Sequence, residues 1–330
     1  MANLQSFIIR RVIQGFFVIW GVITTVFLLR SLTPGNPAVL VAPEDASNEL
    51  IETITIELGL DQPLHIQYIE YIASILQGDL GFSYASRTAV APRIANALPA
   101  TLELAFVAMI FAIIISIPLG IIGAQNRGTK LDYGSNLISM AGLSTPNFWL
   151  GILLVLLFSV QIGVLPTSAR PVGIVEAVSM LLFSFDPTGI TTWMAHMILP
   201  TIALGTYFMA LIFRLTRSGI LDELGKDYIL AARAKGLPES YLMYRYVFRN
   251  SVAPVITVIG LQLGTLIGGS VVIESVFAWP GVGTLFINAV RLGDWPTVQG
   301  VMIVIGVGYV VINLLVDIFY AKINPKVALS

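Results

Sequence analysis

The chain has no cysteine, only two histidines and few charged residues. Asp, Glu, Lys and Arg make up 11% of its 330 residues, whereas a soluble domain carries about 25%. Without cysteine the chain forms no disulfide, iron–sulfur cluster or thiolate zinc site. The charge deficit, with 56% hydrophobic residues and a mean hydropathy of +0.85, excludes a soluble globular enzyme, a disordered chain and a nucleic-acid-binding protein. The composition predicts an all-α integral membrane protein.

Six apolar stretches are long enough to cross a bilayer, because a spanning helix needs about 20 mostly apolar residues. A seventh apolar stretch, 172–185, is shorter and contains Glu176. We interpret it as an interfacial or re-entrant segment. The six expected transmembrane helices lie at 12–29, 101–124, 136–160, 194–213, 254–278 and 298–320.

The positions of the basic residues support this count, since Lys and Arg gather on the cytoplasmic side of membrane proteins. With six spans and both termini in the cytoplasm, 13 of the 18 basic residues fall on cytoplasmic segments. A seventh span at 172–185 would move the basic segment 214–250 outside. The 13 residues are Arg10, Arg11, Arg127, Lys130, Arg214, Arg217, Lys226, Arg233, Lys235, Arg245, Arg249, Lys322 and Lys326.

The loop 33–98 carries an excess of acidic residues, which fits the outer face of the membrane. Ser47 can cap a short helix that ends at Gly59. Pro63 suits the start of a second helix, which Gly78 can end. We interpret the loop as a small helical cap on the outer surface, and a docking surface for an external partner is compatible with this.

The loop 214–250 holds the densest group of basic residues. Asp227 can cap a helix over 228–235, Gly236 supplies a left-handed residue at its end, and Pro238 prevents its continuation. An ordinary interfacial helix is the alternative interpretation. It fits less well, because acidic residues flank the basic ones.

A series of short motifs resembles, in order, the motifs of ABC importer permeases. The resemblance is closer to the dipeptide/oligopeptide (peptide/nickel) permease subunits, and it covers nearly the whole chain. One departure is Leu230, which stands where the general motif has glutamate. The motifs are GDLGFS at 78–83, LPATLEL at 98–104, STPNFWLG at 144–151, HMILP at 196–200, DYILAARAKGL at 227–237, RNSVAPVITV at 249–258, ESVFAWPGVG at 274–283 and NLLVDIFY at 313–320.

This resemblance implies a type I ABC importer permease fold in the cytoplasmic (inner) membrane. Its parts would be the N-terminus with the first helix at 1–32, the extracytoplasmic cap at 33–98 and the permease core at 99–330. The segment 227–237 would be a coupling helix, a rigid lever that sits in a groove of a cytoplasmic ATPase. Its expected contact residues are Asp227, Tyr228, Ala231, Ala232, Arg233, Lys235, Gly236 and Leu237.

The resemblance also implies partners. These are a second, related permease forming a heterodimer, two ATPase subunits and an extracytoplasmic solute-binding protein. We expect short peptides as the substrate, with nickel complexes, glutathione or another small solute as alternatives. Gly225 and Lys226 are followed by Asp227 instead of Ser or Thr, so no phosphate-binding loop is present. We therefore expect no catalytic residue, metal ligand or bound cofactor in this chain, with ATP and Mg on partner subunits.

An ion-coupled secondary transporter is the main alternative from another class, and a membrane anchor with no transport path is a third. No span carries a central acid–base pair, and inverted repeats are not evident. Glu103, Glu274 and Asp317 lie near the ends of spans. We interpret them as structural pairs or interfacial positions instead of a proton relay.

Three glycines spaced four apart, Gly260, Gly264 and Gly268, lie on one face of the fifth expected span. Small residues at this spacing let helices approach closely in a membrane. The face can serve internal packing, a permease–permease interface or the pathway. Gln262 and Thr265 of the same span are candidates for a polar pathway surface.

Overall fold

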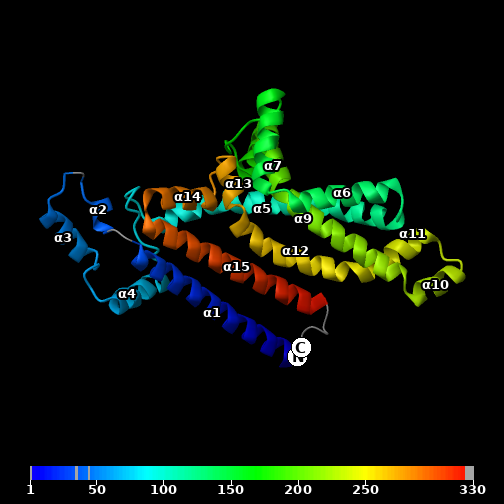
Figure 1. Cartoon of the computed structure of the whole chain (residues 1–330), viewed down its shortest axis with the longest axis horizontal. Helices are drawn as coiled ribbons and strands as arrows, with labels where there is room; N and C mark the ends of the chain where they lie inside the picture. The colour runs from blue at the N-terminus through cyan, green and yellow to red at the C-terminus, as the bar shows by residue number, and fades with distance from the viewer. Residues whose placement is uncertain (1, 34–35, 44, 324–330) are drawn as a thin grey trace. The chain divides into compact units, whose positions relative to one another are not determined.

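The computed structural model describes residues 2–33, 36–43 and 45–323 (Figure 1). These residues form helices and one isolated antiparallel β-bridge between Phe82 and Ala89. The chain divides into two compact units, one of residues 1–101 with 280–330 and the other of residues 102–279. The predicted all-α class is confirmed.

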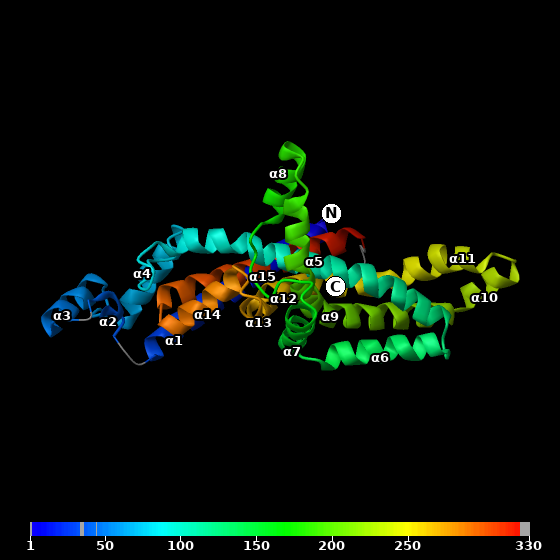
Figure 2. The same cartoon turned by 90° about the horizontal axis from the view of Figure 1, so that it is seen from above.

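The first unit pairs the two ends of the chain. Helices α1 and α15 lie side by side in Figures 1 and 2. A Cβ atom on Gly15 would come within 2.6 Å of Val310, so this contact leaves no room for a side chain. Helix α5 (Val90–Gln125) begins in this unit, inside the segment expected to be the cap. Its other helices are α1 (Ala2–Leu32), α2 (Ala38–Val41), α3 (Asn48–Glu57), α4 (Leu64–Leu76), α14 (Val282–Leu292) and α15 (Trp295–Ile323).

The local signals of the cap segment are confirmed. The Ser47 hydroxyl accepts a hydrogen bond from the Leu50 N–H at the start of α3, at 3.3 Å. Gly59 and Gly78, with φ of +63° and +80°, follow α3 and α4 in left-handed conformations. Pro63 occupies the residue before α4. At the start of α3 the Ser47 side chain satisfies a terminal backbone N–H that has no partner within the helix.

A buried carboxylate, Asp294, joins the segment before α5 to the start of α15. Its side chain is 1% exposed. It accepts hydrogen bonds from the hydroxyls of Ser83 and Thr297, both at 2.6 Å, and from the Tyr84 N–H at 3.1 Å. The Arg93 guanidinium lies 3.3 Å away and supplies the opposite charge. Several donors and one cation stabilise this buried charge.

The second unit is built around α9. This helix packs against α6, α7, α8 and α12, and Figure 2 shows α6 and α12 running along it. The helices of this unit are α6 (Lys130–Ser144), α7 (Asn147–Leu154), the π-helix η1 (Val155–Gln161), α8 (Ile174–Ser184), α9 (Thr188–Leu224), α10 (Asp227–Ala234), α11 (Glu239–Tyr241), the π-helix η2 (Leu242–Phe248), α12 (Arg249–Gly269) and α13 (Val271–Val276).

Among the described residues, five helices are long and apolar enough to cross a membrane, or up to six if the pair Lys130–Ser144 and Asn147–Gln161 is one span. The stretch 136–160, expected to be one transmembrane helix, is instead divided between two helices that are bent by 105° at a break. Thr145, with ψ of 123°, is extended, as expected for the residue before a proline. This break explains the bend.

Two other boundaries bear on the predicted spans. The expected fifth span reached Ala278, but α12 ends at Gly269 and α13 is a separate short helix after Ser270. The stretch 172–185 forms α8, which has only 11 residues. Its short length is as expected, and its interfacial or re-entrant position stays a prediction.

Two buried carboxylates of the second unit, Asp132 and Glu103, are paired with arginine. Asp132 of α6 accepts two hydrogen bonds from Arg217 of α9, at 2.7 and 2.9 Å. Glu103 accepts hydrogen bonds from Arg170 and Trp193. In the first unit, Asp317 lies 3.1 Å from Arg11. The expectation that Glu103 and Asp317 form structural pairs fits these contacts. Glu274, also expected near a span end, is fully buried and accepts a hydrogen bond from the Ser270 hydroxyl at 2.9 Å.

The Asp294 cluster predicts a large stability effect. Asp294→Ala removes the carboxylate that Ser83 and Arg93 contact, and breaking a buried charge pair costs about 3 kcal/mol or more. We expect a clear drop in the melting temperature of the detergent-solubilised protein. Glu239→Ala, which breaks the exposed pair with Arg233, is the control and should cost at most about 1 kcal/mol. Equal melting temperatures for the two variants would contradict this role of Asp294.

Candidate functional site

The segment 227–237, predicted to be a coupling helix, follows α9 directly. It forms α10 over Asp227–Ala234. The prediction that Asp227 caps this helix is wrong. Lys226 is the extended residue at the cap position, with ψ of 145°, and Asp227 is the first helical residue. A carboxylate in the first turn still favours the positive end of the helix dipole.

The C-terminal end of α10 is as predicted. Gly236 has φ of +76°, a conformation that side chains disfavour. Lys235 is the C-cap residue of α10, and Pro238 is the residue before α11. The Arg233 guanidinium of α10 forms two hydrogen bonds to Glu239 of α11, at 2.5 and 3.2 Å. This pair connects the last turn of α10 to α11.

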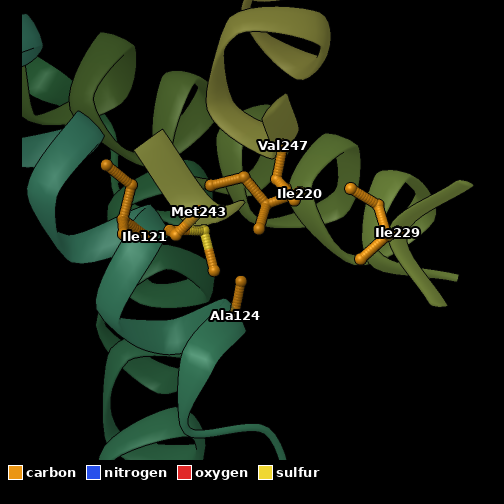
Figure 3. Close-up of a cluster of buried hydrophobic side chains, with 6 residues drawn as sticks. All are labelled: Ile121, Ala124, Ile220, Ile229, Met243 and Val247. Atoms are coloured by element: carbon orange, nitrogen blue, oxygen red, sulfur yellow. The ribbon is translucent and has the colours of Figure 1, made fainter. Parts of the chain in front are cut away.

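One apolar side chain anchors α10. Ile229 is fully buried in a cluster that Figure 3 shows in close-up. The other members come from the end of α5, from α9 and from η2. Helix α10 is too short to be stable alone. Burial of the Ile229 side chain stabilises the folded helix by about 1.5–3 kcal/mol. The cluster residues are Ile121, Ala124, Ile220, Ile229, Met243 and Val247.

A polar network provides the second anchor. Glu223, at the end of α9, is 5% exposed. It accepts a hydrogen bond from the Lys226 ammonium at 2.6 Å and another from the Tyr228 hydroxyl. The Asn250 amide of α12 donates to the same hydroxyl at 2.9 Å. This series of hydrogen bonds connects α9, α10 and α12.

The network also perturbs two of its own groups. The hydrogen bond to Glu223 raises the pKa of Lys226 above its ordinary value. Burial, followed by the hydrogen bond to Glu223, raises the pKa of Tyr228. Both shifts favour the protonated form, which is the form in which the two side chains donate to Glu223.

Most of the predicted contact residues face outward. Ala231, Arg233, Lys235 and Gly236 are exposed, while Ala232 and Leu237 are half-buried. Tyr228 is 38% exposed although its hydroxyl is engaged. The exposed and half-buried residues all lie on one short segment of the chain. Its contact with an ATPase stays a prediction.

The residues of α12 predicted to serve helix packing or the pathway differ in their exposure. Gly260 and Gly264 are buried, Gly268 and Thr265 are exposed, and Gln262 is half-buried. The Thr265 hydroxyl donates to the Gln262 side-chain oxygen at 2.8 Å, so these two polar groups satisfy each other. The set lies apart from 227–237 in the chain, and its role in packing or in the pathway stays a prediction.

Three residues of the site were missing from the sequence prediction: Ile229, Glu223 and Asn250. Ile229 is the one large apolar residue of α10 whose side chain is buried. Glu223 was noted only as one of the flanking acids. Asn250 belongs to the motif at 249–258. It is 22 residues from Tyr228 in the sequence, and the two side chains come together only in the folded chain.

Comparisons with known proteins agree with the arrangement of apolar helices. Residues 116–329 match the family described as "Binding-protein-dependent transport system inner membrane component", and residues 4–105 match the N-terminal part of such membrane components. A chain of the MetNI methionine ABC transporter, solved in inward-facing conformations, has the same fold with a TM-score of 0.51 at 19% identity. The alignment covers 70% of this chain and 94% of that one.

Two relatives match over nearly their full length. The chain is 38% identical over 322 residues to the glutathione transport system permease protein GsiC of Escherichia coli O6:H1, covering 98% of each. It is 38% identical over 340 residues to the dipeptide transport system permease protein DppB of Escherichia coli K12, again covering 98% of each. The chain therefore belongs to the family of inner-membrane components of binding-protein-dependent transport systems, as a permease subunit of an ABC importer and not an enzyme.

Proposed function

We propose that this chain forms half of a translocation pathway for short peptides, and that a cytoplasmic ATPase drives it through α10. The observation that carries the proposal is the combination of a double anchor and an exposed patch on one eight-residue helix. A lever must transmit displacement to the spans without fraying. Helix α10 is tied to α9 and α12 on one side while Ala231 and Lys235 stay open on the other.

The exposed patch suits a protein partner. Leu230 is 54% exposed on α10, although it is apolar. Alanine side chains next to it permit close approach of another surface. The guanidinium of Arg233 has five donors, of which two bind Glu239, so further donors remain for acids of a partner. An ATPase groove with an apolar floor and acidic rim would complement these groups.

The family and the charge distribution support the remaining partners and the topology that we propose. The other half of the pathway is a second, related permease, with two ATPases inside and a solute-binding protein outside. Both termini lie in the cytoplasm, because this orientation places 13 of the 18 basic residues there. The cap segment then faces outward, where the solute-binding protein docks. ATP and Mg bind to the ATPases.

The two relatives support short peptides as the substrate class. One is named for glutathione and the other for dipeptides, and both solutes are short peptides. Nickel complexes or another small solute are the alternative. Mass spectrometry of ligands that copurify with the partner solute-binding protein separates these, and we expect peptides of two to a few residues. A metal complex or a sugar as the sole bound ligand would contradict the substrate class and leave the family unaffected.

The left-handed residue at the end of α10 gives a test of the lever. Gly236→Val places a β-branched side chain at φ of +76°, which costs about 1–3 kcal/mol. We expect it to unwind the end of α10 and to reduce ATP-driven uptake in proteoliposomes severalfold. Gly236→Asn should be milder, because Asn tolerates this conformation. Gly225→Ala, at a φ of −79°, is the matched control. Normal uptake and ATPase attachment with valine would rule out the lever.

The apolar anchor gives a second test. Ile229→Ala leaves a cavity in the cluster, and such truncations cost about 2–5 kcal/mol. We expect backbone amides of 227–237 to exchange hydrogen faster, while those of α12 stay protected. ATP hydrolysis should then become less dependent on substrate. Ile229→Val, with an expected cost of about 0.5–1.5 kcal/mol, serves as the control. Unchanged exchange in the alanine variant would mean that Ile229 does not anchor α10.

A further inference from the structure

A cavity of about 260 Å³ lies in the second unit, between α6, the last turns of α5 and the middle of α9. We call it the α6 cavity, and neither the family assignment nor the lever mechanism uses it. A dry apolar cavity of about 150 Å³ is large enough for a benzene-sized molecule, so the α6 cavity can hold part of a longer hydrocarbon chain. Its large apolar side chains are Leu119, Ile122, Leu131, Ile138, Met209 and Phe213.

Three polar side chains line the α6 cavity, and two of them are already satisfied. The hydroxyls of Ser135 and Ser139 each donate to a backbone carbonyl at 3.0 Å. The third, Lys130, is exposed, and its ammonium forms no hydrogen bond or ion pair with any described residue. No acid of the described chain lines the cavity, and nearby Asp132 is bound to Arg217. One cation without a counter-charge therefore borders an apolar wall.

A glycine in the middle of α6 leaves the cavity open. Gly134 lines the cavity, and a Cβ atom there would meet no atom of the described residues within 4 Å. Gly142, about two turns further along α6, differs, since its Cβ would come within 3.0 Å of Ala210 on α9. Close packing explains Gly142 but not Gly134, although glycine is unfavourable inside a helix. A larger side chain at Gly134 would fill the space.

The start of α6 adds positive potential beside this space. Lys130 is the first residue of the helix, and Thr129 at the cap position forms no side-chain cap hydrogen bond. Free N–H groups in a first helical turn attract anions. An occupant thus needs an apolar part for the wall and an anionic group for Lys130. In a chain that crosses a membrane, a lipid with a net negative headgroup supplies both parts.

We propose that the α6 cavity binds an anionic phospholipid. One acyl chain lies along Leu131 and Ile138, and the headgroup phosphate pairs with the Lys130 ammonium. The site rests on the proposed topology, which places Lys130 on the cytoplasmic side, where anionic lipids attract basic residues. A protein surface over the cavity would have to supply an acid of its own to avoid burying this charge unpaired. A lipid phosphate brings that charge with it.

The test uses the purified full transporter in detergent. Native mass spectrometry counts bound lipids during titration with phosphatidylglycerol or with phosphatidylcholine of the same two acyl chains. We expect the first phosphatidylglycerol to bind at least about fivefold more tightly, because one lysine near a membrane surface attracts anionic lipid by about that factor. sn-Glycerol 3-phosphate, which has the phosphate without acyl chains, should not compete. Equal affinity for the two lipids, or displacement by glycerol phosphate, would overturn the proposal.

Two charge variants locate the headgroup. Lys130→Met should weaken phosphatidylglycerol at least about fivefold at one site and leave phosphatidylcholine unchanged. Arg127→Met is the matched control, because it removes the same charge from an exposed residue that does not line the cavity. It should change the affinity little. Equal losses in the two variants would mean that the basic segment as a whole attracts lipid, and the cavity site would be wrong.

A steric variant locates the acyl chain. Gly134→Leu fills the cavity and should remove one bound lipid from the complex. Gly21→Leu, at a helical glycine of α1 whose Cβ would also meet nothing within 4 Å, is the control and should bind lipid normally. Hydrogen exchange of α6 shows whether each variant is folded. Normal lipid binding by a folded Gly134→Leu protein would overturn the site. Loss of the second permease with lipid binding unchanged would do so too, because that subunit would then cover the cavity.

The lipid measurement is independent of transport, which separates this site from the proposed function. Peptide uptake by a transporter without the lipid preference would leave the proposed function standing and overturn the site. The expected lipid binding by a transporter that takes up no peptide would contradict the substrate class and leave the site standing.

Discussion

Burial of Ile229 is the interaction on which the cytoplasmic site depends. An isolated helix of eight residues is unstable in water because nucleation costs more than a few backbone hydrogen bonds return. Ile229 supplies the missing free energy by entering a cluster built from α5, α9 and η2. The consequence is mechanical as well as energetic. A displacement applied to α10 is transmitted through this side chain to the long helices, because a packed core does not deform continuously.

Scarce charge has a related role in both units. A chain with 11% charged residues cannot rely on a solvated polar surface, and its buried carboxylates connect segments that are distant in sequence. Asp132 and Arg217 are 85 residues apart, and Ser83 and Asp294 are 211 apart. Each acid is surrounded by donors, which offsets the cost of removing its charge from water.

Features that depend on neighbouring residues were predictable from the sequence. The cap at Ser47 and the left-handed residues Gly59 and Gly236 follow from local backbone rules and are confirmed. Asp227 is an instructive failure, since Asp favours both the cap position and the first turn, and the pattern cannot distinguish them. The bend at Pro146 was missed because the apolar run 136–160 masks a local break. The pairing of Asn250 with Tyr228 depends on how α10 folds back, which no local pattern encodes.

The two anchors of α10 together determine which residues a partner can reach. Tyr228 and Ile229 are adjacent, so their side chains point about 100° apart around the helix axis. One contact would leave the helix free to rotate about that contact. Two contacts in different directions, one apolar and one to Glu223 and Asn250, remove this freedom. The face that remains open is therefore the one with Leu230 and Ala231. Because the same contacts that hold the helix also orient this face, a partner that binds there displaces the long helices instead of rotating α10 alone.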